Sequence, residues 1–231
     1  MCRRRRLEND YVDAMLDLLG PRFAWIKARS RPVASPSLRE AIERDLGHCP
    51  LLQPEIDLCM QDEQGRLFAI EIKACSRVEA ETSKPFYQGI GQALALLTYG
   101  FDAVALWFVF EEDGANRSGA QAWWFIRNQL NLPLDFTYYV TERSDGGRMA
   151  FRTHQYEDDR AGHAVGHMGR RTPQWRHANP LADSREQTIV RRHLQPWLAE
   201  RAQRYTQAED GPRGPDHQGM DEPEGMTGPV E

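Results

Sequence analysis

Residues 54–74, PEIDLCMQDEQGRLFAIEIKA, hold two acids and a lysine at spacings that could do chemistry. Successive side chains of a strand point to opposite faces, so Glu71 and Lys73 share one face and the two neighbouring isoleucines share the other. Asp57 lies on the preceding apolar run. A hairpin in the right register would bring Asp57 beside Glu71 and Lys73.

Two carboxylates and an ammonium in an apolar sheet suit phosphodiester hydrolysis. Burying these charges without partners is costly, and a divalent ion between the carboxylates would remove their repulsion. Hard carboxylate oxygens suit Mg²⁺ or Mn²⁺, which act as Lewis acids on phosphate. Lys73 could orient the attacking water or stabilise charge in the transition state.

The alternative for these three residues is a cross-strand salt bridge on a solvent-facing sheet. Two observations weigh against it. Only three of the 29 basic residues are lysines, so the chain uses arginine where any positive charge would do. The residues flanking Lys73 are also apolar. Both observations favour a specific role for this lysine.

The elements that must position these residues can be predicted from periodicity. The turn residues Asp62 to Gly65 between two apolar runs, 55–60 and 67–73, predict a β-hairpin. Around it we expect, in chain order, helix 7–19, strand 22–29, helix 38–46, helix 85–99 and strand 102–110. Further along we expect helix 123–130, a hairpin of 136–141 with 148–154, and helix 184–203.

Capping residues should mark the second helix. Ser37, with Glu40 three residues later, suggests an N-terminal capping box, and Gly47 stands where a C-cap belongs. Gly100 should likewise end the helix of residues 85–99.

Asp57 followed by Glu71-Ile72-Lys73 resembles the PD-(D/E)XK signature of restriction-endonuclease-like nucleases, among them the resolvase-like and RecB-like members. Here Pro54-Glu55-Ile56-Asp57 replaces the bare Pro-Asp of that pattern. The resemblance covers roughly residues 37–111, or begins at residue 7 if the helix of residues 7–19 is part of it. It implies an α/β fold with an αβββαβ core, a mixed central sheet flanked by helices, here with a C-terminal elaboration.

The resemblance also implies a function and site residues. The function is Mg²⁺-dependent (or Mn²⁺-dependent) cleavage of DNA, in repair, recombination or defence, with Asp57 and Glu71 as metal ligands. Asp57, Glu71, Lys73 and Gln92 are then the catalytic residues. Gln88 lies one turn from Gln92, although both glutamines could equally be plain polar helix positions.

The family also places a glutamate from its first helix near the metal. Three residues compete for this position: Glu43 and Glu40 on the helix of residues 38–46, and Glu8 on the helix of residues 7–19. We assign the third metal ligand to Glu43 and leave the other two open. For each, the alternative is a solvated helix charge.

The resemblance implies a nuclease-like domain over residues 1–155, followed by a C-terminal elaboration over 156–206. Composition predicts a disordered acidic tail over 207–231. The tail holds seven acids and one arginine, so the net charge of −5 becomes +1 for the rest. We expect a cytoplasmic protein with no membrane span and nucleic acid, foremost DNA, as partner; a homodimer stays open. The alternatives are a catalytically inactive nuclease-fold module that binds nucleic acid or protein, and an interaction protein whose acidic tail recruits a basic partner.

Overall fold

The computed structural model describes residues 3–50, 52–75, 84–110, 124–143, 149–155, 164–167, 175 and 177–202. The expected tail, residues 207–231, lies outside this part of the chain. The helices are α1 (Arg3–Leu19), α2 (Pro36–Leu46), α3 (Lys84–Leu96) and α5 (Arg185–Glu200). Short helical turns are η1 (Gly20–Arg22), η2 (Pro32–Ala34), η4 (Leu97–Tyr99) and the π-helical η5 (Phe125–Gln129).

Among the described residues, seven strands form one mixed sheet with strand order β1-β2-β3-β4-β5-β6-β7. They are β1 (Trp25–Ser30), β2 (Ile56–Gln61), β3 (Leu67–Cys75), β4 (Ala103–Phe110), β5 (Asp135–Arg143), β6 (Met149–Gln155) and β7 (Ala164–His167). Strands β3, β4 and β5 run parallel, and all other neighbours are antiparallel. The chain is therefore an α/β protein, as expected.

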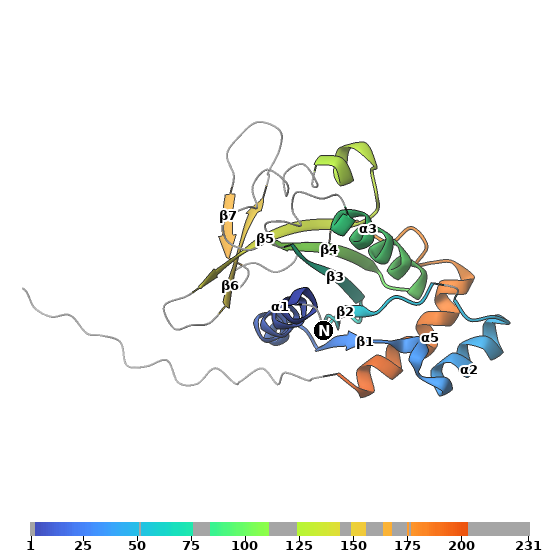
Figure 1. The fold of residues 1–231 in the computed structure, drawn as a ribbon. Helices are drawn as coiled ribbons and strands as arrows, with labels where there is room; N and C mark the ends of the chain where they lie inside the picture. The colour runs from blue at the N-terminus through green and yellow to red at the C-terminus, as the bar shows by residue number, and fades with distance from the viewer. Residues whose placement is uncertain are drawn as a thin grey trace, which may run out of the picture.

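Helices cover both faces of the strands β1 to β5 (Figure 1). On one face α1 packs with a cluster that includes Met15, Ile70 and Trp107. On the other, α2, α3 and α5 pack with a second cluster, to which Ile42 and Leu194 belong. Every residue of β4 is buried, which explains its unbroken apolar sequence.

The hairpin that carries the acids forms in the predicted register. Leu58 pairs with Ile70 and Gln61 with Leu67. In the turn, the Asp62 carboxylate accepts the backbone N–H of the residue four positions on at 2.8 Å. Pairing with β2 covers only the first half of β3, which continues to Cys75 beside β4.

Two helix predictions need correction: the start of the second helix and the expected helix of residues 123–130. The second helix begins at Pro36 after Ser35, whose side chain makes no capping bond, so the capping box at Ser37 is wrong. Proline is favoured in the first helical turn because its missing N–H is not needed there. The C-cap at Gly47 is confirmed, with φ of 86° and its N–H bonded to the Glu43 carbonyl. The expected helix 123–130 is a single π turn after Trp124.

The C-terminal helix completes the core. Val190, Leu194 and Leu198 of α5 join the cluster beneath α2 and α3. Arg191 bonds the Asp102 carboxylate at 2.6 Å, and this carboxylate also accepts the N–H of Leu67 at 2.6 Å. The elaboration expected over residues 156–206 therefore contributes α5 to the same core as the hairpin. No described helix is long and apolar enough to cross a membrane.

Candidate metal and phosphodiester site

Asp57 stands near the start of β2 and is buried, with 8% of its surface exposed. Its Oδ2 accepts the backbone N–H of Ile72 at 2.7 Å. This bond is available because the β2–β3 pairing stops at Ile70, so the carboxylate replaces a strand partner for β3. The aspartate is thereby fixed beside the residues on either side of Ile72.

Glu71 and Lys73 lie on β3 with almost no exposure, 1% and 6%. The Lys73 ammonium lies 2.5 Å from Oε1 of Glu71 and 3.2 Å from the carbonyl oxygen of Ile72. The structure thus brings Asp57, Glu71 and Lys73 together, as strand parity predicts.

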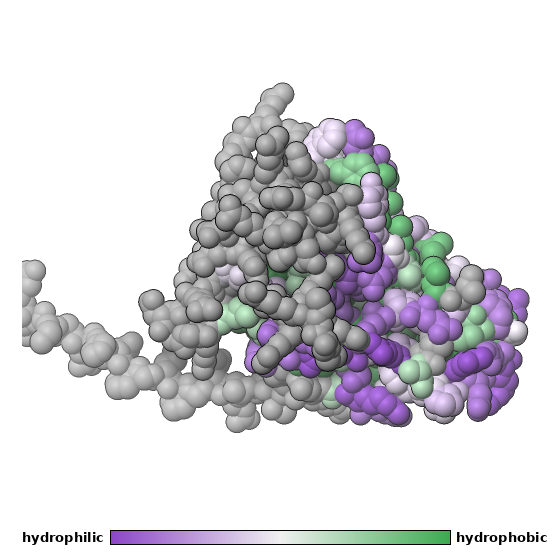
Figure 2. All heavy atoms as spheres, viewed as in Figure 1, coloured by the Kyte–Doolittle hydropathy of each residue, from purple (hydrophilic) through white to green (hydrophobic). Residues whose placement is uncertain are grey.

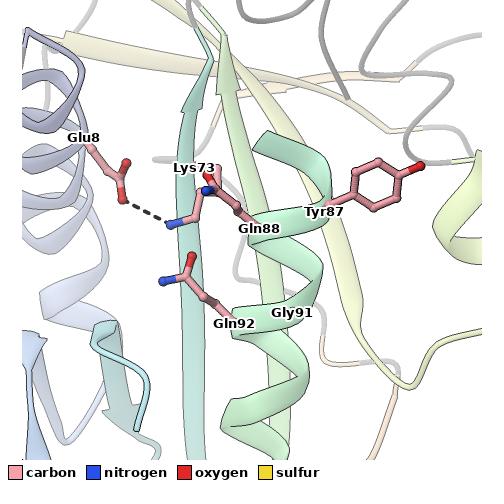
Figure 3. Close-up of a pocket in the computed structure, with 6 residues that line it drawn as sticks. All are labelled: Glu8, Lys73, Tyr87, Gln88, Gly91 and Gln92. Atoms are coloured by element: carbon pink, nitrogen blue, oxygen red, sulfur yellow. Dashed lines mark hydrogen bonds and ion pairs between the residues drawn. The ribbon is translucent and has the colours of Figure 1, made fainter. Parts of the chain in front are cut away.

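Glu8 of α1 joins this group. Its Oε1 lies 3.2 Å from the Lys73 ammonium (Figure 3). α1 contacts β3, and Glu8 meets Lys73 where β3 has lost β2 as neighbour. The site therefore holds three carboxylates and one ammonium, which leaves two formal negative charges when all are ionised.

One oxygen of Glu71 has no partner. Oε1 is paired with Lys73, whereas Oε2 is buried without a hydrogen-bond partner among the described residues. A buried charged oxygen left unsatisfied is strongly destabilising. This oxygen is free to accept a cation or a proton.

Burial and the neighbouring charges shift the pKa values of Asp57, Glu71 and Lys73. Burial raises the pKa of Asp57, against the opposing effects of the Lys73 charge and the Ile72 N–H. Burial, and then the charge of Asp57, raise the pKa of Glu71, with Lys73 opposing. Burial alone would lower the pKa of Lys73, but the charges of Glu71, Asp57 and Glu8 together raise it. Without a cation the carboxylates hold protons more readily than usual, and the lysine stays charged.

These donors fit a hard divalent cation better than a softer metal. Asp57 and Glu71 offer oxygen ligands, and Oε2 of Glu71 is unpartnered. No group of three or more His, Cys, Asp or Glu side chains within the described ranges is arranged to hold an ion. A bound ion would keep several waters, as Mg²⁺ does when one or two carboxylates hold it.

The assignment of the third acid to Glu43 is not supported by the geometry. Glu43 pairs with Arg39 on α2, at 2.9 Å, and Glu40 is exposed on the same helix. α2 packs against α5, and Glu8 is the helix acid that reaches Lys73. The signal was readable, because Glu8 precedes the buried Tyr11 by three residues and so lies on the sheet-facing side of α1.

An open pocket of about 480 Å³ adjoins the group. Its lining residues are Glu8, Lys73, Tyr87, Gln88, Gly91 and Gln92. The amides of Gln88 and Gln92 point from α3 toward Lys73 (Figure 3), so both glutamines lie on the side of the helix that faces the site. Tyr87 and Gly91 were not predicted; each directly precedes one of the glutamines in the sequence but points to a different side of the helix.

Gly89 sets the distance between α3 and Lys73. A Cβ at this position would lie 3.1 Å from Cγ of Lys73 and 3.0 Å from a methyl carbon of Leu106. A side chain at this position would require the helix or these neighbours to move by a few tenths of an ångström. Sequence reasoning missed this residue, because a glycine inside a helix carries no sign of what it contacts.

The chain matches no protein-family model, and no curated protein matches its sequence.

Proposed function

We propose that this protein is a metal-dependent nuclease that hydrolyses phosphodiester bonds in DNA, using Mg²⁺ or Mn²⁺. The observation that carries the proposal is the buried, unpartnered Oε2 of Glu71, beside Asp57 and Lys73 at the edge of an open pocket. A salt bridge on a solvent-facing sheet would leave these side chains exposed. Their burial therefore favours a catalytic site.

The order of elements also supports a restriction-endonuclease-like fold. From α1 to β4 the chain runs α-β-α-β-β-α-β. Omitting α2, this is the αβββαβ order of the PD-(D/E)XK nucleases that the hairpin motif resembles. In this interpretation α2 is an insertion between the first two strands, and α1, with Glu8, is the first core helix.

Each residue then has a role that follows from its contacts. Asp57 and Glu71 would hold the cation, and the Ile72 N–H keeps Asp57 in place. When bound, the ion would polarise a phosphate oxygen and make hydroxide more available from a bound water. Glu8 holds the Lys73 ammonium toward the pocket.

Lys73 acts as a charged donor. Its raised pKa keeps the ammonium protonated at neutral pH, so it is unsuited to accept a proton from water. It can donate a hydrogen bond to the attacking water or to a phosphate oxygen whose charge grows in the transition state. Gln92 offers an amide to the same pocket, where it can orient water or substrate.

The test is cleavage of labelled DNA forms by purified protein with Mg²⁺, Mn²⁺ or EDTA. We expect metal-dependent cleavage that Asp57→Asn, Glu71→Gln and Lys73→Ala each reduce by at least about 100-fold. Glu63→Gln is the matched control, because Glu63 is an exposed acid in the turn of the same hairpin. Robust cleavage by the Asp57→Asn, Glu71→Gln double variant, free of host nucleases, would refute the assignment.

A further inference from the structure

Tyr87 is an exposed aromatic residue at the candidate site. It lines the same pocket as Lys73, yet 66% of its surface is exposed. Its ring projects from α3 on the side away from the lysine, while Gln88 and Gln92 project toward the lysine (Figure 3). The pocket therefore runs from the charged group across the surface of α3 to an aromatic ring.

Gly91 keeps this surface open. A Cβ added there would meet no atom within 4 Å, in contrast to Gly89 two residues earlier. Packing therefore does not require glycine at this position, and glycine inside an exposed helix is unfavourable. Its position four residues after Tyr87 places it one turn along the same side of α3. The missing side chain leaves room for a ligand to pass beside the ring.

Apolar side chains are also exposed elsewhere on the molecule. Figure 2 shows hydrophobic atoms over α3 and η5, and Trp124 and Phe125 at η5 are 51% and 38% exposed.

We propose that the α3 surface binds an unpaired strand of DNA, with a base stacked on Tyr87 and the adjoining phosphate at Lys73. Gly91 gives the sugar-phosphate chain access to the helix surface, and the amides of Gln88 and Gln92 bond to it. The inference rests on the proposed nuclease function and narrows its substrate to single-stranded segments such as overhangs, gaps or flaps.

The strand must be unpaired for a physical reason. Within a duplex, both faces of each base are covered by neighbouring bases, so a protein ring cannot stack on them. A strand without a partner exposes these faces, and stacking on an aromatic residue tolerates any base. The side-chain amides of the pocket both donate and accept hydrogen bonds, so they too place no requirement on which base is bound.

Binding can be tested without cleavage. The full chain is mixed, in EDTA and at low salt, with a fluorescein-labelled oligo(dT) or a blunt duplex of equal length, and anisotropy is recorded. We expect tighter binding of oligo(dT), weakened roughly 5- to 150-fold by Tyr87→Ala, since stacking of a base has this magnitude. Tyr87→Phe should bind like the unmodified protein.

Two further variants separate stacking from a structural effect. Tyr87→Leu keeps an apolar side chain without a ring, so it should lose affinity as Tyr87→Ala does. Gly91→Leu should weaken binding by obstructing the strand, although leucine favours the helix and the melting temperature should be kept or raised. Both variants are compared by circular dichroism to confirm folding.

Several results would overturn the inference. These are equal binding of oligo(dT) and duplex, undiminished binding by Tyr87→Ala, or full binding by Tyr87→Leu, which would indicate a general apolar contact. Metal-dependent cleavage of duplex DNA that Tyr87→Ala leaves unchanged would refute it while upholding the proposed function. Tyr87-dependent binding without any cleavage would refute the function and keep the binding site.

Discussion

Gly89→Ala tests whether the distance between α3 and β3 is set by this residue. The new methyl carbon would lie 3.0 Å from a Leu106 methyl carbon, 3.1 Å from Cγ of Lys73 and 3.2 Å from Cζ of Phe108. Carbon atoms pack best at about 3.5–4.0 Å, so three neighbours on two strands would have to move by a few tenths of an ångström. These three side chains are packed in or beside the core, so moving all of them should cost free energy.

The size of the effect follows from two opposing contributions. Alanine is favoured over glycine inside a helix by about 1 kcal/mol, whereas overpacking a core costs about 1–3 kcal/mol. The net change in the free energy of unfolding should be a loss of up to about 2 kcal/mol.

Gly91→Ala is the matched control. It makes the same replacement in the same helix, but its methyl group meets no atom within 4 Å. It should therefore gain about 0.5–1 kcal/mol from helix propensity alone. The difference between the two variants cancels that propensity and isolates the packing cost at Gly89.

Urea unfolding of both variants measures the difference, and cleavage assays show its effect on the site. If α3 shifts away from Lys73, Gly89→Ala should lose activity, because a displacement of about 1 Å can reduce a rate about 100-fold. Equal stabilisation by the two alanine variants would refute the argument that α3 is held by close contact at Gly89.

Three further predictions concern the buried carboxylates of the site, Asp102 and the C-terminal segment. In EDTA the free energy of unfolding should fall as pH rises from about 5 to 8, because the raised pKa values of Asp57 and Glu71 make the folded state bind protons that the unfolded state releases. Glu71→Gln should flatten this slope, and Mg²⁺ should raise the melting temperature more at high pH than at low pH; a flat profile for the unmodified protein would contradict the burial argument. Asp102→Ala should lower the free energy of unfolding, measured in urea, by about 1–3 kcal/mol, because it removes the carboxylate that accepts the Leu67 N–H and the Arg191 guanidinium of α5. A loss no larger than that of the exposed Glu63→Gln would contradict this prediction. Removal of residues 207–231 should leave the melting temperature unchanged because the segment has few apolar residues to bury, and a large drop would show that it is docked.

The hairpin and the proximity of its three charged residues were predictable from the sequence for local reasons. Alternation along a strand has a period of two, so the shared face of Glu71 and Lys73 follows from spacing alone. The turn at Asp62 then set the register that brings Asp57 beside them. These are short-range rules, and the structure follows them.

The choice among helix acids needed information that spacing does not contain. Glu43 is nearer in sequence to Asp57, but α2 packs on α5 and Glu43 pairs with Arg39. Glu8 is 65 residues from Lys73 and reaches it only because α1 contacts β3. Likewise, the different surroundings of Gly89 and Gly91 depend on which strands lie beneath α3.

The position of α5 has a consequence for how the protein is made. Arg191 binds an aspartate 89 residues earlier, and His193 lies beside Asp45, 148 residues earlier in the chain. During synthesis, the apolar face formed by α2 and its neighbours stays uncovered until residues 185–200 have left the ribosome. Nascent chains stalled before that point should expose this face and engage chaperones, whereas chains that have just released α5 can close the core.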